Sequence, residues 1–269
     1  MVRYQAIAVD LDHTLLQPDG GISAANRTAL AAASAAGWAV IIASGRRLDS
    51  IREISQMLAL PVYVAGLNGA YVVAPNQRVL ASVPLATTTA MALFDLAAGS
   101  GVNVIMNTAS GTWYFPGNTA LDVPEYITQA ATATVVTSRM RLTELAQTHT
   151  IYKVAYNGTD QVVLHQLAQA AQALVDPVWS DANYLEMAAP GVSKLSGLTA
   201  VAQDLKLELK QFVACGDYLN DLAMLRGVGL GVAMANGLPV VQEAADVVID
   251  NTAYDGVGRI VTKLLQKAG

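Results

Sequence analysis

Two short acidic motifs at opposite ends of the chain, each directly after an apolar run, constrain its fold more than any other feature. Asp10 and Asp12 follow residues 5–9, and Asp217 and Asp221 follow residues 211–215. Short apolar runs of this kind, flanked by polar residues, are typical of buried parallel strands. Carboxylates at the ends of such strands lie where α/β sheets bind ligands. We therefore expect the two motifs to meet at one edge of a parallel sheet.

Four acids at one edge of a sheet need a compensating cation. Two carboxylates about 4 Å apart repel each other by roughly 4 kcal/mol at an effective dielectric constant near 20. A hard divalent cation is the natural partner, and Mg²⁺ usually takes one or two carboxylates and leaves its other positions to water and phosphate oxygens. The two motifs therefore predict phosphate chemistry with Mg²⁺ as cofactor.

The bulk composition restricts the class of partner. The chain has 269 residues, of which 53% are hydrophobic and 14% charged, so it can bury a large core and has room for two domains. Its net charge of −5 and the absence of a basic cluster argue against binding to nucleic acid or an anionic membrane. We expect a small phosphorylated metabolite as the partner, while the oligomeric state stays open.

The single cysteine and the N-terminal residues bear on the compartment. Cys215 alone excludes an intramolecular disulfide and a cysteine-rich zinc site, which favours a reducing compartment. The apolar run before Asp10 is too short for a signal peptide. The longest apolar stretch, residues 24–44, contains polar residues and is interpreted as a helix followed by a strand, not as a membrane span. We therefore expect a cytoplasmic protein.

The N-terminal residues alternate between strand and helix patterns. Ser23 is a suitable cap for a helix over residues 24–36, and Gly37 is a suitable end. A strand over residues 38–43 follows, then a helix over 49–58 and a strand over 62–65. This alternation predicts a doubly wound parallel sheet of the Rossmann type, with the strand ends at one rim.

The pattern changes in the middle of the chain. Residues 83–186 contain strand-like segments at 102–106, 112–115 and 151–156, helix-like segments at 122–133 and 161–174, and no catalytic cluster. After this segment the alternation of strand and helix resumes. We therefore expect an α/β core formed by residues 1–82 and 187–269, with residues 83–186 inserted as a second α/β domain.

Phosphoryl transfer needs a nucleophile, a proton donor for the leaving group and positive charge around the phosphoryl oxygens. Asp10, at the end of a strand, is the predicted nucleophile, because an aspartate can form an aspartyl-phosphate. Asp12 points the same way if the strand geometry continues, and it is the predicted acid and base. Ser44 and Gly45 offer a hydroxyl and backbone amides to phosphate oxygens, and Lys194 offers an ammonium.

The second motif is predicted to hold the metal. Asp217 and Asp221 are the expected ligands, because a spacing of four would place both on one face of a helix. Asn220 is expected to orient the substrate phosphate as a neutral donor. Asn68 either shapes a turn or binds substrate, and Arg46 either contacts substrate or forms a surface ion pair.

These residues, in this order, resemble the haloacid dehalogenase superfamily of phosphohydrolases, and in particular its Cof-type branch, subclass IIB. The resemblance covers nearly all of residues 1–82 and 187–269. It implies a Mg²⁺-dependent phosphatase with a Rossmann-like core and an α/β cap, inserted after the third strand, that sets substrate specificity. It also implies that Asp10 and the backbone carbonyl of Asp12 bind the metal together with Asp217 and Asp221. The motifs that carry the resemblance are residues 10–15, 44–46, 68–70, 192–194, 216–221 and 231–236.

Three positions depart from the pattern of the family. His13 and Leu195 stand where the family usually has glycine, and Tyr218 replaces a small hydroxyl residue. Histidine tolerates a positive φ better than most residues, so we expect the turn at His13 to form. The ring is then free to touch the substrate or to tune Asp12. None of the three changes removes a reacting group.

Two other functions stay open at this point. A phosphomutase of the same superfamily would transfer phosphate between hydroxyl groups and release none. A catalytically weak protein that binds a phosphorylated ligand would result if His13 and Tyr218 spoiled the site. A nucleotide-dependent dehydrogenase is disfavoured, because the glycine-rich residues 227–232 lack the final glycine of the dinucleotide fingerprint.

Overall fold

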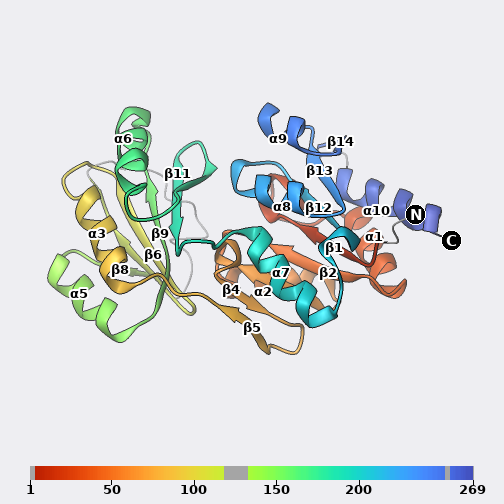
Figure 1. Cartoon of the computed structure of the whole chain (residues 1–269), viewed down its shortest axis with the longest axis horizontal. Coiled ribbons are helices and arrows are strands. Elements are labelled where there is room, and N and C mark those ends of the chain that lie inside the picture. The colour runs from red at the N-terminus through yellow and green to blue at the C-terminus, as the bar shows by residue number, and fades with distance from the viewer. Residues whose placement is uncertain (1–3, 118–132, 252–254, 269) are drawn as a thin grey trace. The chain divides into compact units, whose positions relative to one another are not determined.

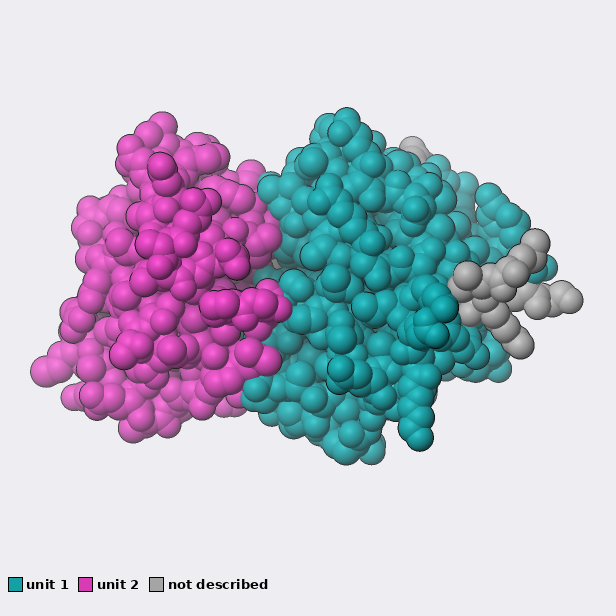
Figure 2. Space-filling model, in the orientation of Figure 1, with its two compact units in different colours: residues 1–82, 193–269 teal, residues 83–192 magenta. Residues whose placement is uncertain are grey.

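The computed structural model describes residues 4–117, 133–251 and 255–268. The chain divides into two compact units (Figure 2). Unit 1 is formed by residues 1–82 and 193–269, and unit 2 by residues 83–192. The sequence predicts that the inserted domain ends at residue 186, but strand β11 (Tyr184–Ala188) pairs with β9 (Ile151–Asn157) of unit 2 up to its last residue. The second boundary between the compact units lies between residues 192 and 193.

Unit 1 is built on an eight-stranded sheet in the described part of the chain, in the order β14-β13-β12-β1-β2-β3-β4-β5 (Figure 1). The strands from β14 to β3 pair in parallel, and β4 and β5 add an antiparallel hairpin at one edge. The strands are β1 (Ala6–Val9), β2 (Ala39–Ala43), β3 (Val62–Gly66), β4 (Tyr71–Val73), β5 (Val79–Ser82), β12 (Phe212–Gly216), β13 (Leu230–Met234) and β14 (Val247–Ile249).

Helices cover both faces of this sheet because its central strands carry apolar side chains on both faces. In β1, Ile7 and Val9 belong to a core that includes side chains of α1, α2 and α10, whereas Ala6 and Ala8 belong to a core with side chains of α7, α8 and α9. A strand whose two faces are both apolar has to be covered twice. The helices are α1 (Ala24–Ala35), α2 (Leu48–Leu58), α7 (Lys194–Leu205), α8 (Leu222–Gly227), α9 (Pro239–Ala244) and α10 (Gly256–Ala268). The predicted doubly wound α/β fold is confirmed.

Unit 2 is a second α/β layer structure. Its described strands form a sheet in the order β10-β11-β9-β6-β7-β8, antiparallel except for the parallel pair of β7 and β8. One core of buried side chains joins this sheet to its helices. Besides β9 and β11, the elements are α3 (Thr87–Ala97), β6 (Asn103–Thr108), β7 (Thr112–Phe115), β8 (Ala133–Val135), α5 (Arg139–Thr148), α6 (Gln161–Ala171) and β10 (Val178–Asp181).

The predicted elements mostly agree with the structure. The helix expected over residues 24–36 is α1, and the side chain of Ser23 accepts a hydrogen bond from the backbone N–H of Asn26, as a cap should. The helix expected over residues 122–133 lies outside the described residues, except for Ala133, which begins β8. None of the helices described is both long and apolar enough to span a membrane.

Candidate active site

Three carboxylates from the two acidic motifs lie together at one edge of the parallel sheet. Strands β1 and β12 are parallel neighbours with Val9 opposite Cys215, so Asp10 and Asp217 leave the sheet side by side. The carboxylate oxygens of Asp10, Asp217 and Asp221 all lie within 4.8 Å of one another, and all three residues are buried. Within the described residues this is the one group of His, Cys, Asp and Glu side chains close enough to share a metal ion. The sheet topology thus brings together three of the four predicted acids.

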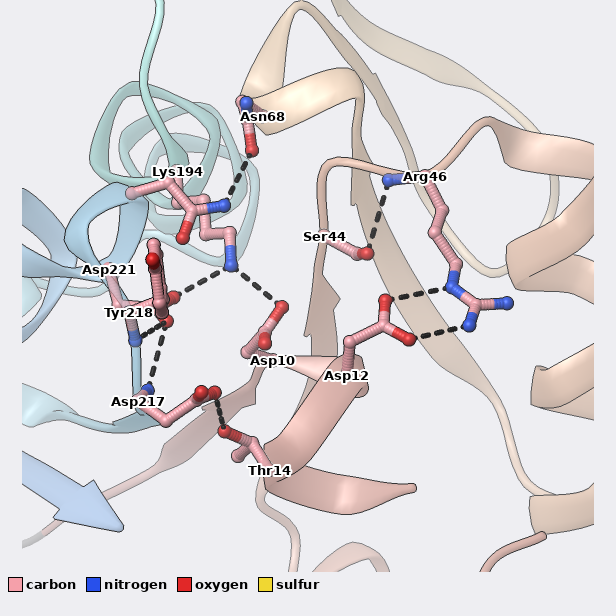
Figure 3. Close-up of polar contacts among 11 residues, drawn as sticks. Asp10, Asp12, Thr14, Ser44, Arg46, Asn68, Lys194, Asp217, Tyr218 and Asp221 are labelled. Atoms are coloured by element: carbon pink, nitrogen blue, oxygen red, sulfur yellow. Dashed lines mark hydrogen bonds and ion pairs between the residues drawn. The ribbon is translucent and has the colours of Figure 1, made fainter. Parts of the chain in front are cut away.

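Lys194 lies between two of these carboxylates (Figure 3). Its ammonium Nζ is 2.6 Å from Oδ1 of Asp10 and 2.7 Å from Oδ1 of Asp221, and the side chain is only 1% exposed. Three carboxylates and one ammonium leave an excess of negative charge in a buried place. Such an excess favours a bound cation.

The pKa values reflect this crowding. Burial raises the pKa of Asp10 well above its usual value, and the charge of Lys194 opposes the rise. Burial, followed by the charge of Asp221, raises the pKa of Asp217 to about 6. Burial alone would lower the pKa of Lys194, but Asp10 and Asp221 together raise it above its usual value. Lys194 is therefore charged at neutral pH.

The position of Asp221 follows from a folded-back loop and not from the expected helical spacing. Asp217 follows β12, and Asp221 ends a short 3₁₀ turn (Leu219–Asp221) before α8. Oδ2 of Asp221 accepts hydrogen bonds from the backbone N–H groups of Asp217 and Tyr218. A Cβ on Gly216 would lie 2.4 Å from the Asp221 carboxyl carbon, so only glycine fits there. The prediction that both aspartates share a helical face is wrong, because Asp217 lies before the 3₁₀ turn and α8 and belongs to neither.

Lys194 is held by a close approach of two backbone segments. It begins α7, whose first turn is capped by Ser193. The start of α7 touches the turn Leu67–Gly69, where a Cβ on Gly69 would lie 2.3 Å from the carbonyl oxygen of Ser193. Gly69 also has φ +91°, which favours glycine. The close contact at Gly69 therefore fixes the position of the backbone from which the Lys194 side chain extends into the site.

Thr14 lies in the first acidic motif, and the sequence pattern predicts no role for it. Its hydroxyl Oγ1 donates a 2.7 Å hydrogen bond to Oδ1 of Asp217, and both residues are buried. This bond favours the ionised carboxylate and opposes the rise in the pKa of Asp217. The sequence feature that could have identified Thr14 is its place in the turn that carries the predicted catalytic aspartates.

Asp12 is turned away from the three carboxylates, toward Arg46 (Figure 3). Oδ2 of Asp12 accepts a 2.9 Å hydrogen bond from Nε of Arg46, and Oδ1 accepts a 2.5 Å hydrogen bond from Nη2. Of the two alternatives for Arg46, the structure therefore shows an ion pair, and its partner is a predicted catalytic residue. The side chain of Asp12 does not join the acidic cluster.

The other predicted site residues follow the ends of β2, β3 and β12. Ser44 is buried beside Gly45, and its Oγ accepts a hydrogen bond from the backbone N–H of Arg46. Asn68 has φ 56° and ψ 32°, a left-handed conformation that asparagine tolerates well. Its Oδ1 accepts a 3.3 Å hydrogen bond from Nδ2 of Asn220, so the two asparagines form one polar unit. Figure 3 shows Asn68 near Lys194.

Comparison with known proteins decides the family. The family model for haloacid dehalogenase-like hydrolases matches residues 7–261. This chain belongs to the haloacid dehalogenase-like hydrolases. The resemblance inferred from the sequence motifs is confirmed, and the protein is an enzyme of this hydrolase family.

The hydrolase is similar to phosphatases along nearly its whole length. The 5-amino-6-(5-phospho-D-ribitylamino)uracil phosphatase YcsE of Bacillus subtilis (strain 168) is 28% identical over 262 residues, which cover 97% of this chain and 95% of the relative. The pyridoxal phosphate phosphatase YbhA of Escherichia coli (strain K12) is 29% identical over 269 residues, covering 96% and 97%. The solved structure of the HAD subclass IIB sugar phosphatase BT4131 has the same fold, with a TM-score of 0.83 at 20% identity and coverage of 96% and 98%.

Two of the departures from the family pattern have a visible structural setting in this hydrolase. His13 adopts φ 60° and ψ 5°, and its carbonyl oxygen accepts a 2.8 Å hydrogen bond from Nδ2 of Asn236, so the turn forms as expected. Leu195 packs against Gly227, where a Cβ would lie 2.5 Å from a Leu195 methyl group. The absence of a side chain at position 227 makes room for the larger residue at 195.

Proposed function

We propose that this hydrolase is a Mg²⁺-dependent phosphatase that cleaves small phosphate monoesters through an aspartyl-phosphate. The observation that carries the proposal is the buried group of Asp10, Asp217 and Asp221 with Lys194 bonded between two of them. Phosphoryl transfer needs a nucleophile and positive charge around the phosphoryl oxygens. Asp10 supplies the nucleophile, and Lys194 together with a cation bound by the acidic group would supply the positive charge. The phosphatases to which the chain is similar support the same reaction class.

The donor set fits a hard divalent cation. The available ligands are carboxylate oxygens, which Mg²⁺ prefers, and the cluster carries more negative than positive charge. Asp10 and Asp217 would hold the ion, with the backbone carbonyl of Asp12 as the family resemblance implies. Asp221 already accepts three hydrogen bonds, so we assign it mainly to holding Lys194 and the backbone at Asp217. When bound, the metal supplies positive charge to the phosphoryl oxygens.

The first displacement forms a bond between an Asp10 oxygen and phosphorus. The bond between phosphorus and the ester oxygen breaks, and the ester oxygen takes a proton from Asp12 and leaves as an alcohol. Lys194 keeps Asp10 oriented and faces the phosphoryl group with positive charge. The hydroxyl of Ser44 and the backbone N–H of Gly45 bind phosphoryl oxygens.

The second displacement releases phosphate. Asp12, now a carboxylate, takes a proton from a water molecule, whose oxygen attacks phosphorus while the bond to Asp10 breaks. Inorganic phosphate leaves, and Asp10 and Asp12 return to their starting states. Asn68 and Asn220 supply neutral polar groups beside Lys194 that orient the substrate phosphate.

We propose further that unit 2 is the cap that selects the leaving group. It is inserted between the two segments of unit 1, and its described residues contain no acidic cluster of the kind found in unit 1. The organic part of the substrate is expected to be small, as in the phosphatases to which the chain is similar.

Phosphate release from a panel of esters tests this function. The panel contains 5-amino-6-(5-phospho-D-ribitylamino)uracil, pyridoxal phosphate, several sugar phosphates and 4-nitrophenyl phosphate, each with Mg²⁺ or with EDTA. We expect release that requires Mg²⁺, with a clear preference among the alkyl esters. Transfer of phosphate between hydroxyl groups without release would support a mutase, and tight binding of an ester without turnover would support a binding protein.

A further inference from the structure

Arg46 is a basic residue that the proposed reaction does not use, although it contacts the proposed acid and base directly. Both oxygens of Asp12 accept hydrogen bonds from the same guanidinium, one from Nε and one from Nη2 (Figure 3). A two-point contact of this kind fixes the plane of the carboxylate as well as its position. A single surface ion pair would not do so.

Arg46 is the more firmly held member of the pair. Its backbone N–H donates to Oγ of Ser44, its carbonyl oxygen accepts from the N–H of Leu67, and its Nη1 donates to Oγ of Ser50. The Arg46 side chain is 15% exposed and the Asp12 side chain 42%. The guanidinium therefore belongs to the framework at the end of β2, and Asp12 is oriented by it.

The Asp12 carboxyl group keeps one lone pair on each oxygen that can carry the proton transferred to the ester oxygen. Each carboxylate oxygen has two lone pairs, and Arg46 takes one on each oxygen. Without Arg46, an aspartate exposed to this extent would sample several rotamers. The Asp12 carboxyl group would then spend a smaller fraction of its time in the orientation that proton transfer to the ester oxygen needs.

We propose that Arg46 is the positioning residue for Asp12, and that cleavage of esters with poor leaving groups depends on its two-point contact. This inference rests on the proposed phosphatase function. Protonation by Asp12 matters for an alkyl oxygen, which leaves poorly as an anion, and matters little for nitrophenolate, which leaves without a proton. Loss of Arg46 should therefore act selectively on the two kinds of ester.

The test compares kcat/KM for an alkyl phosphate and for 4-nitrophenyl phosphate, because kcat/KM reports the steps up to departure of the alcohol. Arg46→Gln is expected to lower kcat/KM for the alkyl ester by about 10- to 100-fold, as loss of a residue that orients a catalytic group commonly does. The value for the nitrophenyl ester should change by less than about threefold. Arg46→Lys, which keeps the charge but cannot form the fork, should restore little of the loss.

Two further variants separate positioning from general damage. In an Asp12→Asn background, Arg46→Gln should have almost no additional effect on the alkyl ester, because it acts through Asp12. Arg78→Gln is the matched control, since Arg78 pairs with Asp204 in the same unit without touching a site residue. It should leave both esters unchanged.

Several results would overturn the inference: equal loss on both esters, no loss on the alkyl ester, a gain in rate, full rescue by Arg46→Lys, or an additive effect in the Asp12→Asn background. Failure of the phosphatase function itself would look different. In that case the wild type would release no phosphate from either ester.

Discussion

Replacing Lys194 by methionine should destabilise unit 1, because it leaves buried carboxylates without their ammonium. Lys194 is 1% exposed and bonds Asp10 at 2.6 Å and Asp221 at 2.7 Å. Removing one partner of a buried ion pair typically costs about 3–5 kcal/mol. For a domain of this size each kcal/mol shifts Tm by about 2–4 °C, so Lys194→Met should lower Tm by roughly 10 °C.

The assay is thermal unfolding at pH 7.5 with EDTA, with Lys210→Met as the control. Lys210 pairs with Glu208 on the surface, where both side chains are more than half exposed. Lys210→Met should therefore lower the free energy of unfolding by no more than about 0.5 kcal/mol. Acidification should reduce the difference in Tm between Lys194→Met and wild type. Carboxylates with a raised pKa in the folded state destabilise it when ionised, and this penalty disappears as they bind protons. Mg²⁺ should narrow the gap as well.

The result that would refute this reasoning is a Tm for Lys194→Met in EDTA as close to wild type as that of Lys210→Met. The stability of the fold around the buried carboxylates would then not depend on the Lys194 ammonium. A gap that grew on acidification would contradict the sign of the proposed effect.

Three further predictions concern the metal site and its support. Because the pKa of Asp217 is raised to about 6 without metal, Mg²⁺ affinity measured by calorimetry should fall as the pH drops below 6, and constant affinity between pH 5 and 7 would argue against Asp217 as a ligand. Thr14→Val removes the hydrogen bond that favours the ionised form of that carboxylate, so the pH below which Mg²⁺ affinity falls should move upward; an unchanged pH profile of Mg²⁺ affinity would leave Thr14 without a role. Gly69→Ala should lower Tm more than Gly20→Ala, because both glycines have positive φ but only Gly69 faces a backbone atom, the Ser193 carbonyl oxygen, at 2.3 Å; equal losses would show that the contact is unimportant.

Local patterns in the sequence were sufficient for the elements that carry the site. The runs before Asp10 and Asp217 are the neighbouring parallel strands β1 and β12, and the segments predicted at residues 24–36 and 49–58 are helices α1 and α2. Each of these has a clear apolar period or a capping residue, so its structure is determined nearby. The strand order then places both acidic motifs at one edge.

Contacts between distant residues were not predictable in this way. The hairpin of β4 and β5 was missed because its strands are short and β5 is partly exposed. The bond of Asp12 to Arg46 joins the ends of two neighbouring strands, and that of Thr14 to Asp217 joins residues 203 positions apart. Asp221 has its observed position because its carboxylate caps the backbone at Asp217 and Tyr218, which a spacing of four does not reveal.

Phosphate release by wild type and by Asp10→Asn, side by side with Mg²⁺, tests the central claim most directly. The amide has nearly the same shape as the carboxylate, and Lys194 keeps its bond to Asp221, so the variant should fold with an unchanged or higher Tm. We predict that the wild type releases phosphate from at least one alkyl ester and that the folded variant releases none above the rate without enzyme. Substantial turnover by folded Asp10→Asn would contradict the assignment of Asp10 as nucleophile.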